Sequence, residues 1–248
     1  MERHPLVGSV VPVADLSRRD VAEMFAVHAR LYERVSEAAF ASDLAEKQWA
    51  LLLREGSGGP IRGFTTILLL EVTVQGEPLA VVFSGDTGID PAHWGGQALV
   101  KTWARFMGET LAAYADRRLF WFLISKGYRT YLYLPFFFHE FFPRIDVATP
   151  AFARALIDTL GGLKYPRDFN PATGVIEFDE SHGHLRPMLA DTPDHRRDHP
   201  HVRFFLERNP GYARGNELVC VAEISPANMK GLARRTLLEG SQRLAVVS

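Results

Sequence analysis

The sequence predicts an α/β chain in which helices cover a mixed β-sheet. Three apolar runs, QWALLLRE, IRGFTTILLLEVTV and LAVVFSGDTGI, follow one another with only the turn signals GSGGP and QGEP between them, which indicates an antiparallel meander. A helical pattern then separates the third run from a fourth, LFWFLI at residues 119–124. Because a strand–helix–strand crossover makes its two strands parallel, the sheet is expected to be mixed.

Two helices are expected between a first strand and the meander. The run VGSVVPVA is rich in valine and is typical of a strand. Between residues 17 and 35, apolar side chains recur with helical spacing. Ser17 followed by Asp20 is typical of a helix N-terminus with a capping box. The segment EAAFASDLAEK predicts a second, shorter helix.

The chain after the meander alternates between helices and strands. A helix is expected from about Gln97, and its apolar face includes Trp103 and Met107. A helix followed by a loop is expected between Ser125 and Arg144. The remaining elements are, in order, a helix at PAFARALIDTLGG, a strand at GVIEFDE, a short helix at VRFFLERNP, a strand at ELVCVAEI and a final helix at PANMKGLARRTLLEG, which begins at its proline.

Composition favours one domain over residues 1–248, with a core of about 10–147 and a C-terminal part, 148–248, that completes the sheet and adds helices. The 248 residues are 47% hydrophobic and 23% charged, which is usual for a globular chain. The net charge of -1 argues against a general nucleic-acid-binding surface. The single cysteine, Cys220, excludes an internal disulfide, and its apolar run favours an inert core thiol.

No targeting or membrane segment is expected. The start, MERHPLVGSV, has no long apolar run, and charged residues and proline interrupt the most apolar region, LFWFLISKGYRTYLYLPFFFHEFF. This region therefore lacks the ~20 continuous apolar residues of a membrane helix. We expect a cytoplasmic protein without an integral membrane segment, and the sequence leaves open whether it forms a homodimer.

The stretch SGDTGIDPAHWGGQALVK, residues 84–101, raises the main functional question. A strand ends there, the chain turns through Gly95 and Gly96, and a helix begins. The first N–H groups of a helix lack intrahelical partners and its dipole adds positive charge, so a bound phosphate would satisfy both. The alternative is a simple turn in which Asp90 or His93 caps the helix. Neither a G-x-x-x-x-G-K-[ST] loop nor a G-x-G-x-x-G motif is present.

The element order and the residues HWGGQA resemble the GCN5-related N-acetyltransferase (GNAT) superfamily. The acyl-carrier loop of that superfamily has the pattern [QR]-x-x-G-x-[GA]; His93 replaces glutamine or arginine, whereas Gly96 and Ala98 match. The similarity in element order covers roughly residues 10–225. It implies a GNAT-like acyl-CoA N-acyltransferase fold with a C-terminal extension. It also implies acyl-CoA or the acyl-phosphopantetheine of a carrier protein as donor, and no metal.

The resemblance further implies where the donor binds. In the superfamily, the strand before the loop and the next strand splay apart, and the pantetheine arm lies between them; here these are LAVVFSG and LFWFLIS. The residues expected to bind the donor are Phe83, Ser84, His93, Trp94, Gly95, Gly96, Gln97, Ala98 and Ser125. A dense aromatic patch either packs helices or lines a channel for a long acyl chain, as in the branch near autoinducer synthases and long-chain N-acyl amino acid synthases. This patch consists of Phe136, Phe137, Phe138, Phe141 and Phe142.

Acyl transfer to an amine needs a base for the amine and a proton for the departing thiolate. Glu71, which interrupts ILLLEVTV, and Asp86, which closes the third meander strand, are candidate bases. The alternatives are a solvent-facing strand position for Glu71 and a turn cap for Asp86. Tyr128 and Tyr131 lie just beyond residues 119–124 and are candidate proton donors, with helix packing as the alternative.

A histidine-rich segment follows later in the chain. His182, His184, His195, His199 and His201 lie within 20 positions, and H-x-H pairs can bind zinc. Because no glutamate–histidine helix motif accompanies them, a solvated lid or acceptor-specificity loop is favoured. Arg196, Arg197 and the nearby Arg203 suit an acidic partner such as an acyl-carrier protein.

The sequence therefore predicts an acyltransferase that moves an acyl group from acyl-CoA or an acyl-carrier protein directly to a small amine acceptor. One alternative is a catalytically silent member of the same fold that binds a ligand or a protein. A third hypothesis is a histidine-dependent metalloprotein.

Overall fold

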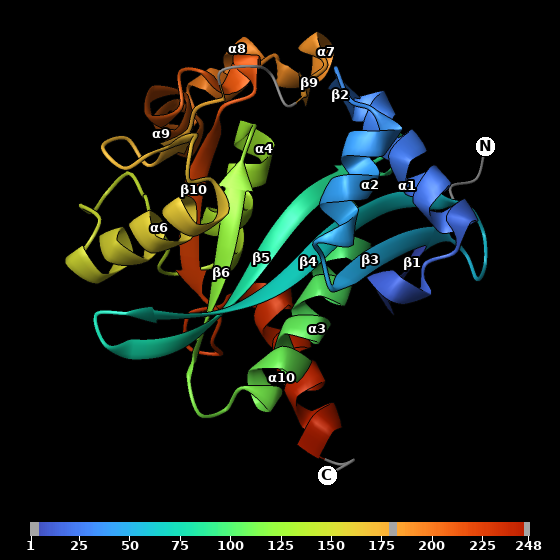
Figure 1. Ribbon diagram of the computed structural model, residues 1–248, viewed down its shortest axis with the longest axis horizontal. Helices are drawn as coiled ribbons and strands as arrows, with labels where there is room; N and C mark the ends of the chain where they lie inside the picture. Colours follow the sequence, from blue (N-terminus) through green and yellow to red (C-terminus); the bar gives the residue numbers. More distant parts are fainter. Residues whose placement is uncertain (1–4, 179–182, 246–248) are drawn as a thin grey trace.

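The computed structural model describes residues 5–178 and 183–245. Within these residues, eight strands form one mixed sheet in the order β1-β3-β4-β5-β6-β10-β8-β7, and two short strands, β2 and β9, pair with each other (Figure 1). The strands of the large sheet are β1 (Leu6–Pro12), β3 (Trp49–Glu55), β4 (Ile61–Val74), β5 (Glu77–Ile89), β6 (Arg118–Ser125), β7 (Phe169–Asn170), β8 (Val175–Ile176) and β10 (Glu217–Glu223).

The antiparallel meander and the parallel crossover that the sequence predicts are both confirmed. Strand β3 pairs with β4 and β4 with β5 in antiparallel register, whereas β5 and β6 are parallel. The β4–β5 hairpin turns at Gln75 and Gly76, whose φ angles of 51° and 85° are both left-handed. This geometry matches the twist of a two-residue hairpin turn.

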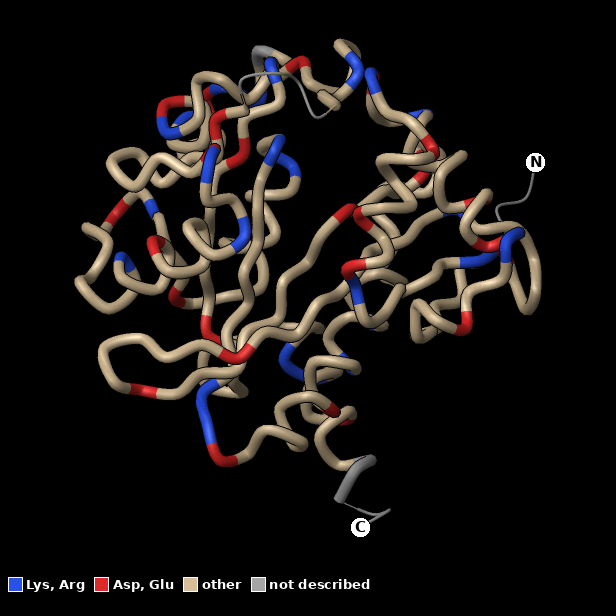
Figure 2. The backbone as a smooth tube through the Cα atoms, viewed as in Figure 1, with Lys and Arg blue, Asp and Glu red and all other residues tan. Residues whose placement is uncertain are grey.

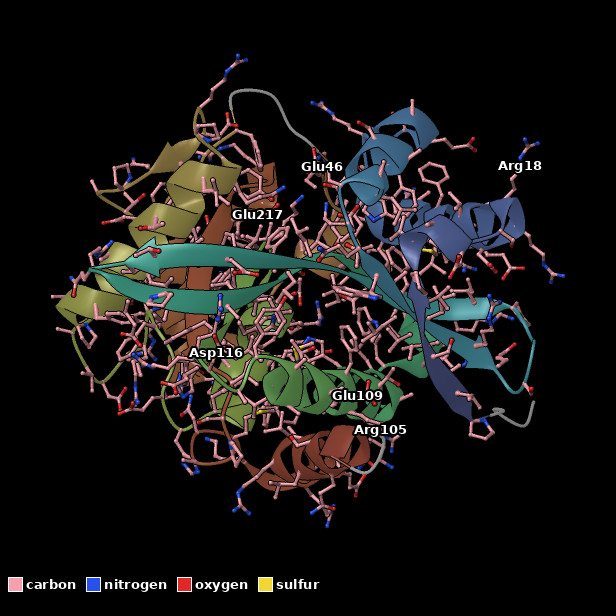
Figure 3. The ribbon with its side chains drawn as sticks, turned by 60° about the horizontal axis from the view of Figure 1, so that its bottom comes forward. Arg18, Glu46, Arg105, Glu109, Asp116 and Glu217 are labelled. Carbon is pink, nitrogen blue, oxygen red and sulfur yellow. The ribbon has the colours of Figure 1, made fainter. Side chains whose placement is uncertain are left out.

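Helices cover both faces of the sheet (Figure 3). The longer ones are α1 (Arg18–Leu31), α2 (Glu37–Ala45), α3 (Ala98–Ala113), α6 (Ala151–Lys164), α9 (Pro200–Arg208) and α10 (Gly231–Ala245). Shorter ones are α4 (Tyr128–Tyr131), α5 (Tyr133–Phe137), α7 (Pro187–Ala190) and α8 (Asp194–Arg197). Helices α1, α2 and α6 lie on one side of the sheet, and α3 and α10 lie on the other.

The alternation of side chains along β5 builds the two layers of the core. Leu79 and Val81 belong to the apolar cluster under α6, whereas Ala80 and Val82 belong to the cluster under α3 and α10. Successive strand residues point to opposite faces, so a continuous apolar run is buried on both sides.

Helix α1 begins where the sequence predicts. The Ser17 side chain accepts the backbone N–H of Asp20, and the Asp20 side chain accepts the backbone N–H of Ser17, so the capping box is confirmed. Met24, Val27 and Leu31 then bury one helix face against the sheet.

Strands β5 and β6 separate partway along their length, and this separation positions the site. Their parallel pairing ends at Ser84 and Leu123. Beyond that point β5 continues to Ile89 paired only with β4, and β6 pairs only with β10. Among the described residues, the facing edges of the two strands therefore have no ladder partner, and Figure 1 shows the strands diverging.

Three predicted elements differ from the structure. The final helix begins at Gly231 rather than at Pro226, because Met229 bridges to Phe138 and the Lys230 N–H donates to the Phe137 carbonyl. Of GVIEFDE, only Val175–Ile176 is a strand among the described residues, and residues 179–180 lie outside them. The region from Ser125 to Arg144 holds two short helices, α4 and α5, rather than one.

Among the described residues, no helix has the length and apolarity needed to cross a membrane.

Candidate active site

A cavity of about 510 Å³ opens where β5 and β6 separate, on the side of the sheet covered by α1, α2 and α6. We call it the acidic cavity. It is lined by His28, Tyr32, Arg34, Val35, Ser36, Ala39, Phe40, Asp43, Phe83, Gly85, Asp86, Thr87, Leu123, Ile124, Lys126, Thr130, Tyr165, Asp168, Phe178 and Glu217. Its volume lies within the range of ~300–1,000 Å³ that is usual for small-molecule sites.

Asp86 is the carboxylate on the β5 wall of this cavity. It makes no hydrogen bond or ion pair with the described residues. Burial raises its pKa, an effect that the nearby His28 imidazole opposes. A half-buried carboxylate with a raised pKa, facing a cavity, is well suited to accept a proton.

His28 lies beside Asp86, on the wall formed by α1. The residue is 7% exposed, and its Nδ1 atom has no hydrogen-bond partner among the described residues. Burial lowers its pKa, which the Asp86 carboxylate counteracts. The ring stacks on Tyr32 with centroids 4.5 Å apart. His28 is therefore neutral near pH 7 and holds a fixed orientation toward the cavity.

Ion pairs occupy two other carboxylates of the cavity. Asp43 is 2.7 Å from the Nζ of Lys47, and Glu217 is 3.3 Å from the Nζ of Lys126. Burial raises the pKa of Glu217, and Lys126 opposes that shift. Asp168, in contrast, makes no ion pair with the described residues. Figure 2 shows acidic and basic positions on the chain segments on both sides of the separation between β5 and β6.

A second, apolar cavity of about 50 Å³ lies on the opposite side of the sheet, under α3. We call it the α3-side cavity. It is lined by Thr65, Ser84, Thr87, Leu99, Val100, Trp103, Trp121, Leu123, Thr130, Tyr133, Phe137, Phe138 and Ala233. Ser84 helps to fix its wall, because its hydroxyl oxygen accepts a 2.8 Å hydrogen bond from the Trp121 indole N–H.

The two cavities meet at the separation of the strands. Thr87, Leu123 and Thr130 line both of them. A molecule lying between β5 and β6 would thus contact the apolar cavity on one side of the sheet and the acidic cavity on the other.

The corner that precedes α3 is exposed at the same end of the sheet. Residues 94–97 are exposed, and no side chain of the described residues caps the helix at Gln97. Gly95 has a φ of 83°, which favours glycine. Asp90 caps the short 3₁₀ turn Pro91–His93 by accepting the Ala92 N–H, so it does not cap α3. The initial N–H groups of α3 remain suited to an anion.

His93 and Trp94 hold this corner in place. The Nε2 of His93 is 3.4 Å from a Glu55 carboxylate oxygen, and the Trp94 indole N–H donates to the Ile89 carbonyl over 2.8 Å. The Arg129 guanidinium lies 4.9 Å from the Trp94 ring and donates to the Leu189 carbonyl. The contact between Trp94, which follows β5, and Arg129, which follows β6, therefore connects the chain segments beyond the ends of the two strands.

A segment from the C-terminal part crosses the opposite rim of the acidic cavity. Strand β2 (Tyr32–Glu33) pairs with β9 (His184–Leu185). The Lys126 Nζ donates to the Gly183 carbonyl over 3.0 Å, and the Arg186 N–H donates to the Leu31 carbonyl over 2.9 Å. The segment thus joins the end of α1 to the end of β6.

Of the four candidate catalytic residues, Asp86 lines the acidic cavity and the other three line neither cavity. Glu71 lies on the β4–β5 hairpin, where its carboxylate is 2.7 Å from Arg117. The Tyr131 hydroxyl is fully buried and donates to the Pro143 carbonyl, and burial raises its pKa. Tyr128 is also buried, with the Arg129 guanidinium 4.8 Å from its ring.

The candidate donor-binding residues fall into two groups. Phe83 and Ser84 lie at the strand separation, each lining one of the two cavities. Residues 93–98 form the exposed corner before α3. Ser125 ends β6 and is fully buried, and it lines neither cavity.

Sequence reasoning missed several residues that line the cavities. His28 reads as a member of the apolar stripe of α1, and Asp168 follows a helix in a polar stretch, so neither carries a local signal. Tyr133 lines the α3-side cavity and burial raises its pKa. The sequence shows three tyrosines in YRTYLY. Only the structure, in which α4 and α5 are separate helices, shows that Tyr133 is the one that lines this cavity.

The aromatic patch does not line a single channel. Phe137 and Phe138 line the α3-side cavity, whereas Phe141 is buried in the core and Phe136 is 66% exposed. Phe142 packs on the opposite side of the sheet, against the cluster under α6.

The histidine-rich segment does not converge on one point in the described chain. His184 is 3.4 Å from a Glu33 carboxylate oxygen, and the His199 and His201 rings lie 5.7 Å apart. His182 lies outside the described residues. Within residues 5–178 and 183–245, no group of three or more potential ligands is arranged to hold a metal ion.

No protein-family model and no curated protein matches the chain. Among solved structures, a probable N-acyltransferase of unknown function from Enterococcus faecalis is 14% identical over 53% of this chain, with a TM-score of 0.39, and the match spans only 33% of that protein. A GNAT-family N-acetyltransferase from Escherichia coli, solved with CoA, is 19% identical over 56% of this chain and 72% of its own, with a TM-score of 0.38. A GNAT-family acetyltransferase from Brucella melitensis, solved with acetyl-CoA, is 17% identical over 48% of this chain and 76% of its own, with a TM-score of 0.33. The solved structures that match the chain thus include proteins named as members of the superfamily that the sequence resembles.

Proposed function

We propose that the chain is an N-acyltransferase that moves a short acyl group from a CoA-type thioester directly to an amine. The observation that carries the proposal is the separation of β5 and β6, because a small apolar cavity, an acidic cavity and the first turn of α3 all lie beside it.

The donor would lie along the separated strand edges. A pantetheine arm carries amide groups that can pair with backbone groups of β5 and β6 that have no ladder partner in the described chain beyond Ser84 and Leu123. Its phosphate end would reach the exposed corner at residues 94–97, where the N–H groups of Gly95, Gln97 and Ala98 and the α3 dipole favour negative charge.

The volume of the α3-side cavity favours a short acyl group. A space of about 50 Å³ corresponds to roughly three to five water-sized groups at ~10–15 Å³ each. An acetyl group or a slightly longer chain fits this space, and a long acyl chain does not.

The acceptor would bind in the acidic cavity, with its amine next to Asp86. Asp86 takes a proton from the ammonium group, and the free amine attacks the thioester carbonyl carbon. A C–N bond forms and the C–S bond breaks, with its electron pair leaving on sulfur. The phenol of Tyr133, which lines the α3-side cavity and whose pKa is raised by burial, would supply the proton for the thiolate. The products are an amide and a thiol, and no external oxidant or reductant is needed.

A thiol-release assay tests this proposal. The protein is mixed with acetyl-CoA, butyryl-CoA or palmitoyl-CoA and a panel of primary amines, and the released thiol and the amide product are both measured. Amide formation from the short donors supports the proposal. Binding of CoA without thiol release across the panel would favour the silent ligand-binding alternative.

Substitution of Tyr133 by phenylalanine tests whether Tyr133 donates a proton or only packs against its neighbours. Tyr133→Phe keeps the ring and removes only the hydroxyl, so kcat should fall while the KM for acetyl-CoA stays unchanged. Unchanged kcat in a folded variant would remove Tyr133 from the mechanism.

A further inference from the structure

The charged residues that line the acidic cavity indicate which class of amine the acceptor belongs to. We propose that the cavity accepts aliphatic diamines, with the reacting nitrogen at Asp86 and a second, distant ammonium group at Asp168. This inference rests on the proposed function for the role of the reacting nitrogen, but the binding preference can be measured without any acyl transfer.

The first argument is the pairing of the charges. Lys47 and Lys126 already neutralise Asp43 and Glu217. Asp86 and Asp168 are the carboxylates lining the cavity that make no ion pair within the described chain. Both are half-buried, so salt would screen their attraction for a cation only in part.

The second argument is their position on different walls. Asp86 lies on β5, beside the strand separation where the thioester carbonyl would be. Asp168 directly precedes β7, which lies on the β6 side of the strand separation in the order β5-β6-β10-β8-β7. A molecule with one ammonium group at each end can contact both carboxylates, and a monoamine can contact only one.

Aromatic rings line the space between these carboxylates. Tyr32, Phe83 and Tyr165 all contribute to the cavity wall. Burial and the surrounding carboxylates, among them Asp86 and Glu217, raise the phenol pKa values of Tyr32 and Tyr165. Neutral aromatic walls under a negative potential suit an aliphatic chain that carries positive charge at its ends.

A buried polar group also points to a ligand at the reacting end. His28 lines the cavity and is 7% exposed, and its Nδ1 atom has no hydrogen-bond partner within the part of the chain that the structure describes. Buried polar atoms normally have a hydrogen-bond partner. An amine held at Asp86 would supply one.

Arg34 is the cation of the cavity wall that has no ion-pair partner in the described chain, and it is exposed at the rim. An acceptor with a carboxylate would have to use this solvated group while placing its negative charge in a space bordered by Asp86 and Asp168. The two half-buried carboxylates therefore outweigh the exposed guanidinium, and an anionic acceptor is disfavoured.

The test uses three ligands with the same four-carbon chain: 1,4-diaminobutane, butylamine and 4-aminobutanoate. Calorimetric titration of the full chain without donor measures their affinities. We expect 1,4-diaminobutane to bind at least tenfold more tightly than butylamine and 4-aminobutanoate to bind most weakly. Equal affinities for the diamine and butylamine, or a preference for 4-aminobutanoate, would overturn the inference.

Variants assign the distant ammonium group to Asp168. Asp168→Asn should weaken diamine binding to the level of butylamine and leave butylamine binding unchanged, whereas Asp168→Glu should restore part of the preference. Asp15→Asn, at an exposed position outside the cavity, is the matched control. A diamine preference that survives Asp168→Asn in a folded protein would refute this assignment.

Transfer assays with the same ligands separate the two proposals. Selective diamine binding without amide formation would leave the inference standing and remove the proposed function. Amide formation that proceeds best with 4-aminobutanoate would support the proposed function and remove the inference.

Discussion

Replacing Asp86 by asparagine removes the proposed base while keeping the size and polarity of the side chain. A positioned general base contributes ~10²–10⁴-fold to the rate. His28 remains beside the reacting amine, with a free Nδ1 atom and a lowered pKa, and it can take over part of the proton transfer. The single variant should therefore lose about 10²-fold in kcat/KM, or about 2.7 kcal/mol at 1.36 kcal/mol per tenfold. With His28→Gln added, the loss should approach ~10⁴-fold.

The pH dependence distinguishes a base from a structural residue. A primary amine has a pKa near ~10.4, so more of it is already deprotonated as the pH rises. The deficit of Asp86→Asn relative to the native protein should shrink between about pH 7 and about pH 10. A deficit that stays constant across this range would show that Asp86 acts through structure and not through proton transfer.

The same substitution should stabilise the fold at neutral pH. Burial raises the pKa of Asp86 in the folded chain, so ionisation of this group favours the unfolded state. This penalty is absent below the unfolded pKa of ~3.9 and grows as the pH rises through the folded pKa. Asp86→Asn should therefore raise the Tm at pH 7 and change it little at low pH.

Initial rates of thiol release over the pH range, together with thermal unfolding of each variant, provide the assay. Asp15→Asn is the control for a change of charge at an exposed site. Full activity of Asp86→Asn at pH 7, in a protein that unfolds cooperatively, would refute the assignment of the base.

Further predictions concern packing, the thiol and the corner before α3. Gly108→Ala would place a Cβ atom 2.0 Å from the Leu237 carbonyl oxygen and should reduce the free energy of unfolding by ~1–3 kcal/mol in a denaturant titration. The control Gly162→Ala meets nothing within 4 Å in α6 and should stabilise by up to ~1 kcal/mol; equal effects of the two would contradict the close α3–α10 packing. Burial raises the pKa of the Cys220 thiol, so the native protein should not react with a disulfide reagent until it unfolds, and rapid native labelling would contradict its burial. Gly95 has a φ of 83°, so Gly95→Ala places a Cβ atom in a left-handed conformation at a cost of ~1–2 kcal/mol. This variant should raise the KM for acetyl-CoA without changing kcat. An unchanged KM would remove this corner from the donor site.

Local signals predicted most of the fold. The capping box at Ser17 and Asp20 fixes the start of α1, and the turn at Gln75 and Gly76 fixes the hairpin. Such signals depend on residues close together in the chain, so the sequence displays them directly. The crossover rule then gives the parallel pairing of β5 and β6.

Long-range contacts decided the features that the sequence did not show. The start of α10 depends on pairing between residues 229–230 and 137–138, which lie far apart in the chain. Glu71 carries the residue type of a base, yet only the folded hairpin shows that it meets Arg117.

The candidate site shows the same division. Asp86 could be selected because it follows an apolar run, although it does not close the strand as predicted, since β5 continues to Ile89. The corner at residues 93–98 could be selected from its glycines. His28, Asp168 and Tyr133 become site residues only because α1, α6 and α5 bring them to the two cavities. The sign of the cavity charge likewise depends on which carboxylates the lysines neutralise.

A crystal structure of the protein with a non-transferable thioether analogue of acetyl-CoA tests the central claim most directly. The account predicts a pantetheine arm between β5 and β6 beyond Ser84 and Leu123, phosphate oxygens at the N–H groups of residues 95, 97 and 98, and the acetyl group facing the α3-side cavity. An analogue bound elsewhere, with the separated strand edges left without ligand, would contradict it.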